Sequence, residues 1–234
     1  MGKRITQQSR GHGSLTYRTK DQAFKFRVTY PELSAQGEGQ VLKLINLIGY
    51  NAPLAKIMFN GKIFYNIAAQ NIQEKQKIQI GKNVQLIPGN IGFLMDFPIG
   101  TEIFNIEIFP GSGGKLVRSG GIFAKIIGKD DQNITVLMPS KNEKKFSPKI
   151  RATIGVSAGA GRVDKPFVKA GNKYHKMKAK GGRIYPKTSA LKMNAVDHPF
   201  GSGRGKRIKS KIAKRNAPPG AKVGHVRPRR TGRR

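Results

Sequence analysis

Positive charge is concentrated at the C-terminal end of this 234-residue chain, and that concentration limits what the chain can fold into. Residues 149–234 contain twenty-five Lys and Arg but only two Asp, a net charge of +23. Residues 1–30 carry +6, whereas residues 31–148 are nearly balanced at +4. Crowded cations repel one another until a polyanion neutralises them. Nucleic acid is the first candidate partner, because phosphate binding releases condensed counterions, and an anionic membrane is the second.

The C-terminal segment is also too poor in apolar side chains to fold by itself. Residues 181–234 hold ten large apolar residues, which follow neither helical nor strand spacing. Ordering such a segment costs about 1–2 kcal/mol per residue, and burial of so few side chains does not offset that cost. We therefore expect a partner outside the chain to hold this segment in place.

The middle of the chain predicts short β-strands. Apolar residues recur between 41 and 48, and Ala55, Ile57 and Phe59 alternate with Lys56 and Met58. Asn60-Gly61 between two apolar runs predicts a tight hairpin, since both residues tolerate positive φ. Further short runs follow at spacings of roughly 8–12 residues, which is typical of small β-barrels. The sequence predicts a mainly β protein with barrels at 35–110 and 111–180 and basic irregular arms at 1–34 and 181–234.

Several classes of protein are disfavoured. No apolar run approaches the ~18–20 residues that cross a bilayer, and the N-terminus lacks the apolar core of a secretory signal. The chain has no Cys, which excludes disulfides and thiolate metal sites and favours an intracellular protein. The four His residues lie far apart among cations, so we expect no metal site.

One motif suggests catalysis but has a simpler interpretation. Residues 155–159, Gly-Val-Ser-Ala-Gly, match the nucleophile-elbow pattern. The residues that follow are poor helix formers, so a glycine-rich loop is the favoured interpretation. No Gly-Lys pair completes the phosphate-binding loop pattern of nucleotide hydrolases.

The most specific stretch is 194–205, Asn-Ala-Val-Asp-His-Pro-Phe-Gly-Ser-Gly-Arg-Gly. Asp197 and His198 have the residue types of a catalytic pair, but adjacent residues seldom orient each other for catalysis. The alternative is RNA contact. Glycines let the backbone approach phosphates closely, and His198 and Phe200 offer rings that stack on bases. Asp197, almost alone among cations, is suited to fixing the geometry of an Arg or His side chain.

Met193 to Gly203 resembles the signature of the universal large-subunit ribosomal protein two family. Residues 4–17, 111–120 and 215–224 agree with the same family, so the resemblance covers essentially the whole chain. Phe200 stands where bacterial members have a second histidine, as in the archaeal and eukaryotic branch. That branch often has further histidines after the glycines. This chain has Gly205-Lys206-Arg207 there instead, so contacts made by those histidines are not carried over.

The resemblance implies an OB-like barrel followed by an SH3-like barrel, both bound to large-subunit ribosomal RNA in cytoplasmic ribosomes. It implies a C-terminal extension toward the peptidyl-transferase region, with roles in subunit association and tRNA positioning. The expected partners are this RNA, neighbouring ribosomal proteins and, indirectly, tRNA, without a membrane or a homo-oligomer. We expect no cofactor beyond magnesium associated with the RNA.

We predict RNA contacts at the basic, aromatic and glycine-loop residues of the arms and of one barrel loop. They are Arg4, Arg10, His12, Arg18, Lys115, Arg118, Lys173, Tyr174, His175, Lys176, Lys178, Lys180, Arg183, Met193, Asn194, Asp197, His198, Pro199, Phe200, Gly201, Gly203, Arg204, Arg207, Arg215, Asn216, Arg229 and Arg230.

Two other functions stay open at this point. An enzyme with His198 as general base would need a nucleophile or bound water beside the ring, and the sequence shows no such partner. A DNA-packaging protein is allowed by composition, but the predicted barrels and the 193–203 signature argue against it. A structural RNA-binding protein without catalytic residues is the favoured interpretation.

Overall fold

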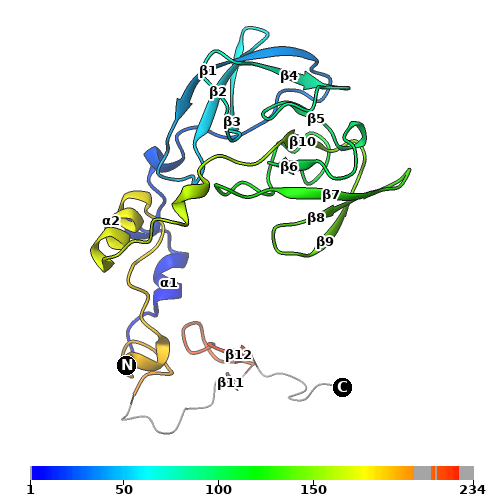
Figure 1. The fold of residues 1–234 in the computed structure, drawn as a ribbon. Coiled ribbons are helices and arrows are strands. Elements are labelled where there is room, and N and C mark those ends of the chain that lie inside the picture. Colours follow the sequence, from blue (N-terminus) through cyan, green and yellow to red (C-terminus); the bar gives the residue numbers. More distant parts are fainter. Residues whose placement is uncertain (1, 203–211, 214, 227–234) are drawn as a thin grey trace. The chain divides into compact units, whose positions relative to one another are not determined.

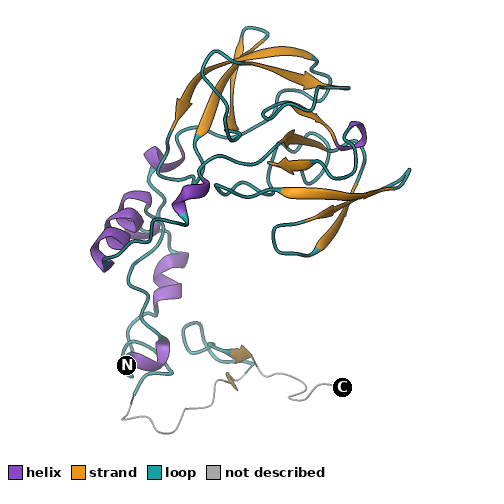
Figure 2. Ribbon diagram, viewed as in Figure 1, coloured by secondary structure: helices purple, strands orange, loops and turns teal. Residues whose placement is uncertain are grey.

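The computed structural model describes residues 2–202, 212–213 and 215–226. The chain forms two compact units. One unit comprises residues 21–168, and the other combines residues 1–20 with residues 169–234. We call them the barrel unit and the arm unit and describe each by itself. Strands dominate the barrel unit, whereas both α-helices found among the described residues belong to the arm unit (Figure 2). The predicted mainly β fold is confirmed.

The barrel unit contains ten strands in one sheet (Figure 1). They are β1 (Gly37–Ile45), β2 (Leu54–Phe59), β3 (Lys62–Ile67), β4 (Lys77–Gly81), β5 (Ile91–Phe93), β6 (Glu102–Phe104), β7 (Ala124–Lys129), β8 (Ile134–Leu137), β9 (Glu143–Phe146) and β10 (Arg151–Ile154). Their order in the sheet is β3-β2-β1-β4-β5-β10-β6-β7-β8-β9. Short 3-10 helices, η2 (Asp21–Phe24), η3 (Leu94–Asp96) and η4 (Ala160–Arg162), interrupt the loops.

Strand β10 joins the two halves of the sheet. It pairs antiparallel with β5 on one side and with β6 on the other. The last strand of this sheet in sequence therefore lies between β5 and β6 and connects the strands on either side. Only β4 and β5 pair in parallel; the other pairs of the ten-stranded sheet are antiparallel. The division between barrels at residue 110 stays a prediction, because β10 belongs to the edges of both.

The hairpin predicted at Asn60-Gly61 is confirmed. Phe59 pairs with Lys62, which leaves a two-residue turn between β2 and β3. Asn60 has φ 47° and Gly61 has φ 72°, the positive values that this turn requires. The turn sets the register of β2, in which Ile57 and Phe59 are buried on the same face of the strand.

Two clusters of buried side chains fill the barrel unit. One, around Val41, Ile57 and Ile78, lies among β1, β2 and β4. The other, around Phe97, Phe104 and similar residues, draws on strands from both halves of the sheet. Val28 and Tyr30 are buried in these cores, although they lie within the range predicted as a basic arm. Their apolar and aromatic surfaces explain the burial.

A buried polar network also connects the halves. The Arg151 Nη2 atom lies 3.0 Å from Glu107 Oε1, and both side chains are almost fully buried. Arg151 Nη1 donates to the carbonyl oxygens of Pro31 and Glu32 at 3.0 and 2.9 Å. Tyr30 donates to the Asn105 carbonyl oxygen at 2.6 Å. The network ties strand β10 to the segment that precedes β1.

The arm unit has little regular structure. Its elements are α1 (Thr6–Gly11), η1 (Leu15–Tyr17), α2 (Ala170–Lys180), η5 (Ala190–Lys192) and the parallel pair β11 (Ile212–Ala213) and β12 (His225–Val226). Among its described hydrophobic residues, only Ile5 and Ala213 are buried. The scarcity of apolar residues thus has the expected consequence, because the described part of this unit forms no hydrophobic core of its own.

Candidate nucleic-acid interface

The first twenty residues present cations on a short helix and the turns that follow it. Arg4 Nη1 donates to His12 Nε2 at 2.7 Å, which brings two of the predicted contact residues together. Arg10 lies exposed in the last turn of α1. Arg18 is held by its Nε atom, which donates to the Gly13 carbonyl oxygen at 2.7 Å. The side chains of Arg4, His12 and Arg18 are therefore partly ordered before any ligand binds.

Helix α2 gathers six of the predicted contact residues. No residue of this helix is buried. Lys178 Nζ lies 5.9 Å from the centre of the Tyr174 ring, and Tyr174 stacks edge-on with His175 at 5.5 Å. The remaining three are Lys173, Lys176 and Lys180. The sequence did not predict this helix, because its four lysines outnumber its two large apolar residues, Tyr174 and Met177, and mask any amphipathic period.

Glycines let the two chain segments of the arm unit approach each other closely. Thr19 and Gly181 form an isolated antiparallel bridge, and the Lys20 amide donates to the Lys180 carbonyl oxygen at 3.2 Å. Gly181, with φ 73°, ends helix α2. A Cβ there would lie 2.8 Å from the Arg18 carbonyl oxygen, so only glycine fits.

The 194–201 segment is a compact turn. The amides of Asp197 and His198 both donate to the Asn194 carbonyl oxygen, at 3.0 and 3.2 Å, and the Gly201 amide donates to the His198 carbonyl oxygen at 2.8 Å. A Cβ on Gly201 would lie 2.3 Å from the Asn194 carbonyl oxygen. Glycine at 201 therefore closes the turn, which is a structural use of a residue predicted as an RNA contact.

His198 is buried inside that turn, with 6% of its surface exposed. Its Nδ1 atom accepts a hydrogen bond from the Phe200 amide at 3.0 Å, which places the proton of a neutral ring on Nε2. The His198 and Phe200 rings lie 5.1 Å apart and tilted. The carboxylate of Asp197 instead lies 3.8 Å from Lys3 Nζ, in a half-exposed pair. The Asp197–His198 catalytic arrangement is therefore not formed among the described contacts.

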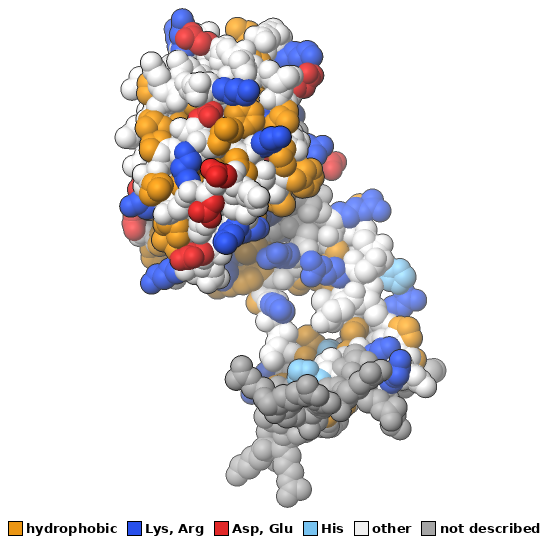
Figure 3. Space-filling view, turned by 90° about the vertical axis from the view of Figure 1, so that its right-hand side faces the viewer, with side chains coloured by type: hydrophobic (Ala, Val, Ile, Leu, Met, Phe, Trp, Pro, Cys, Tyr) orange, Lys and Arg blue, Asp and Glu red, His pale blue; other side chains and the backbone are white. Residues whose placement is uncertain are grey.

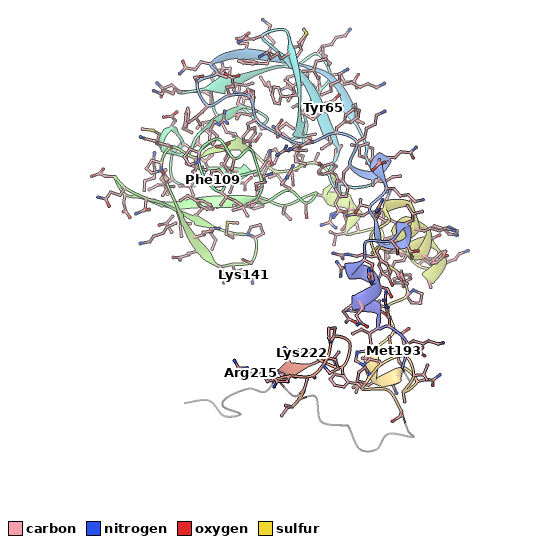
Figure 4. All side chains as sticks on the ribbon, turned by 180° about the vertical axis from the view of Figure 1, so that it is seen from behind. Tyr65, Phe109, Lys141, Met193, Arg215 and Lys222 are labelled. Carbon is pink, nitrogen blue, oxygen red and sulfur yellow. The ribbon has the colours of Figure 1, made fainter. Side chains whose placement is uncertain are left out.

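Most of the other predicted residues lie on the arm unit or outside the described residues. Arg183, Pro199, Arg215 and Asn216 are exposed, and Met193 is half-buried. Arg215 and Lys222 both come from the segment between β11 and β12 (Figure 4). Gly203, Arg204, Arg207, Arg229 and Arg230 fall outside the described residues.

Two predicted residues belong to the barrel unit. Lys115 is exposed. Arg118 is half-buried, and its guanidinium lies 5.8 Å from the centre of the Tyr50 ring. Burial lowers the pKa of Arg118, an effect that nearby Tyr50 partly opposes. Its side chain therefore packs within the unit, and any RNA contact would use only its exposed part.

The nucleophile-elbow motif is structural. Ser157 is fully buried. Its hydroxyl donates to the Ser119 carbonyl oxygen at 2.5 Å and accepts from the Ile122 amide at 3.0 Å. Both interactions tie the loop after β10 to the loop before β7, which confirms the glycine-rich loop interpretation.

The described residues hold no cluster of three His, Cys, Asp or Glu residues that would bind a metal ion. Within the same part of the chain, every helix is too short or too polar to cross a bilayer. On the face drawn in Figure 3, the visible acidic side chains lie on the barrel unit, where cations and hydrophobic residues surround them. The ranges 1–20 and 169–234 contain twenty-six Lys and Arg and one acid, Asp197, a net charge of +25.

Sequence reasoning missed two residues that the fold adds to the predicted set. Lys20 and Tyr185 line the same hollow as Arg18, Tyr174 and Arg183. Tyr185 follows Arg183-Ile184, so its position next to a cation in the sequence could have indicated it as a contact residue. Lys20 had none, because its place depends on the bridge between Thr19 and Gly181.

Comparison with known proteins agrees with this arrangement. Residues 87–220 match the family model described as Ribosomal Proteins L2, C-terminal domain. The chain is 43% identical over 238 residues to large ribosomal subunit protein uL2 of Methanococcoides burtonii, with 100% of each chain covered. It is also 43% identical over 237 residues to the uL2 protein of Archaeoglobus fulgidus, with 99% of each covered. The family resemblance noted in the sequence is confirmed: the chain belongs to the uL2 family of ribosomal proteins.

Proposed function

We propose that this chain is an RNA-binding structural constituent of the large ribosomal subunit and not an enzyme. The observation that carries the proposal is the division of charge and core between the two units. The barrel unit has a packed interior and a net charge of +8. The arm unit has a net charge of +25, and its described residues include almost no buried apolar side chain. Such a unit gains its order by neutralising phosphates.

The two units have different roles in this proposal. The barrel unit supplies a rigid platform for large-subunit ribosomal RNA and neighbouring ribosomal proteins. The arm unit runs between RNA helices and uses exposed side chains such as Arg10, Lys178 and Arg215 for phosphate contacts. In this proposal, any magnesium at the interface is associated with the RNA.

We further propose that the arm supports subunit association, tRNA positioning and the peptidyl-transferase region in cytoplasmic ribosomes. His198 acts there through the shape of its turn. Its Nδ1 atom is used inside the protein, and its ring is largely shielded. A general base needs an accessible atom aligned with the proton it removes, so an indirect role fits this geometry better.

The experiment measures binding of the full chain to large-subunit ribosomal RNA across a salt series. With six to ten phosphate contacts, affinity falls by about 10³–10⁵ between 50 and 200 mM salt. Changing Lys173, Lys176 and Lys178 to Gln on α2 should weaken binding. It should also reduce the dependence on salt by roughly one counterion for each phosphate that these lysines neutralise in the wild-type complex.

A matched variant changes Lys141, Lys144 and Lys145 to Gln. Lys141 lies at the tip of the β8–β9 hairpin (Figure 4), and the other two belong to β9. This variant removes the same charge from the nearly balanced barrel unit and should have a smaller effect. Equal losses of affinity in both variants would show that net charge, and not the arm, governs binding. Failure of the wild-type chain to bind the RNA would refute the proposed function itself.

A further inference from the structure

The arm unit contains a hollow that the predicted phosphate contacts do not explain. It has a volume of about 410 Å³, within the roughly 300–1,000 Å³ of small-molecule sites. Its walls come from residues 15–20 and 174–185, segments separated by the entire barrel unit in sequence. They are joined by the Thr19–Gly181 bridge and by the Gly182 amide, which donates to the Arg18 carbonyl oxygen at 2.9 Å.

The chemistry of the walls combines two kinds of side chain. Arg18, Lys20, Lys178 and Arg183 supply four cations, and no acid lines the hollow. The Nε atom of Arg18 donates to the Gly13 carbonyl oxygen, which steadies its guanidinium. A cluster of cations without a carboxylate is complementary to an anion, and planar guanidinium groups suit phosphate oxygens in particular.

The same walls carry aromatic and aliphatic surface that faces solvent. Tyr174 is 41% exposed, Ile184 is 48% exposed and Leu15 is 84% exposed. Tyr185 also lines the hollow, and Lys173 Nζ lies 5.3 Å from the centre of its ring. A phosphate alone would not use this surface. An unstacked nucleobase would, because every base has a flat face that stacks on an aromatic ring.

We propose that this hollow binds one unpaired nucleotide of the ribosomal RNA, with its base against Tyr174 or Tyr185 and its phosphate among the four cations. The proposal rests on the proposed function and names a ligand for one site within it. A paired helix would present only phosphates and sugars there, so the hollow selects a nucleotide that has left its stack. Leaving a stack costs energy, which the ring and the cations together offset.

The test uses large-subunit particles assembled with the full chain, irradiated so that bases in contact with aromatic side chains crosslink. The expected result is a crosslink from Tyr174 or Tyr185 to one unpaired nucleotide. Tyr174→Leu keeps a large apolar side chain and should abolish the crosslink at that ring and change the chemical reactivity of the same nucleotide. Tyr17→Leu, on a neighbouring tyrosine outside the hollow, should leave both unchanged.

Binding of the purified chain to the RNA gives a second measurement. Replacing by Leu whichever of Tyr174 and Tyr185 forms the crosslink should lower affinity by about 5- to 150-fold, the range for loss of one base–aromatic stack, with an unchanged salt dependence. Arg183→Gln should reduce the salt dependence by roughly one counterion. Lys187→Gln removes the same charge outside the hollow and should leave the reactivity of the crosslinked nucleotide unchanged.

The outcomes separate this inference from the proposed function. Particles that contain the chain, with crosslinks elsewhere on it but none at Tyr174 or Tyr185, would overturn the inference alone. Crosslinks from these tyrosines to a neighbouring protein, or only to added free ATP, would overturn it as well. Absence of the chain from large-subunit particles would instead refute the proposed function.

Discussion

The buried ion pair between Arg151 and Glu107 offers the strongest test of how the barrel unit is held together. Glu107 is fully buried and Arg151 is 2% exposed. Arg151→Met removes the guanidinium that faces the carboxylate and keeps a side chain of similar length. The carboxylate then remains buried without its partner charge, a change that costs about 3–5 kcal/mol in typical proteins, roughly a third of a domain's stability.

The geometry places the expected loss near the lower end of that range. Glu107 keeps two backbone donors, the Gly113 amide at 3.0 Å and the amide of residue 151 at 3.1 Å. The carbonyl oxygens of Pro31 and Glu32 lose a donor, but Glu32 is exposed and water replaces part of that bond. We therefore expect a loss of roughly 3 kcal/mol in the free energy of unfolding.

Urea unfolding of the full chain, followed by far-ultraviolet circular dichroism, measures this loss as a shift of the midpoint at constant slope. Adding Glu107→Gln removes the buried charge that Arg151→Met leaves unpaired. The double variant should therefore be more stable than the sum of the two single changes predicts, by about 1–3 kcal/mol. A loss below about 1 kcal/mol for Arg151→Met, or strictly additive changes in the double variant, would refute the reasoning.

Three further predictions follow from single residues. Burial raises the pKa of Tyr30 far above its usual value of about 10, so the unfolded chain loses the phenol proton at lower pH than the folded chain does, and stability should fall as pH rises above 10. In urea titrations at alkaline pH, Tyr30→Phe should make this decline in stability shallower. An unchanged decline would contradict the prediction. Gly201→Ala should cost the 194–201 turn about 1–3 kcal/mol and weaken RNA binding while the urea midpoint of the barrel unit stays constant; Gly171→Ala, where a Cβ meets nothing within 4 Å, is the control, and equal effects of both would count against the steric argument. His198→Ala should impair particle assembly more than single-turnover peptidyl transfer, and normally assembled particles without any transfer would disprove an indirect role.

The residues themselves determined the division of the molecule and its class. The excess of cations at both ends predicted arms that need a polyanion, and the described residues of the arm unit form no hydrophobic core, as this prediction requires. Asn60-Gly61 predicted its hairpin because the turn depends only on residues adjacent in sequence. The 193–203 stretch indicated the family because its residue types are specific in combination, and the uL2 relatives confirm that identification.

Only the tertiary structure decided which charged and aromatic residues act together. Arg151 and Glu107 look like ordinary surface residues in sequence, and their pairing depends on β10 entering the sheet between β5 and β6. Lys20 and Tyr185 meet in one hollow because the bridge between Thr19 and Gly181 joins two segments that lie far apart in the sequence. Local patterns report on neighbours along the chain. Burial and long-range pairing depend on strand order and backbone closure, which no local pattern encodes.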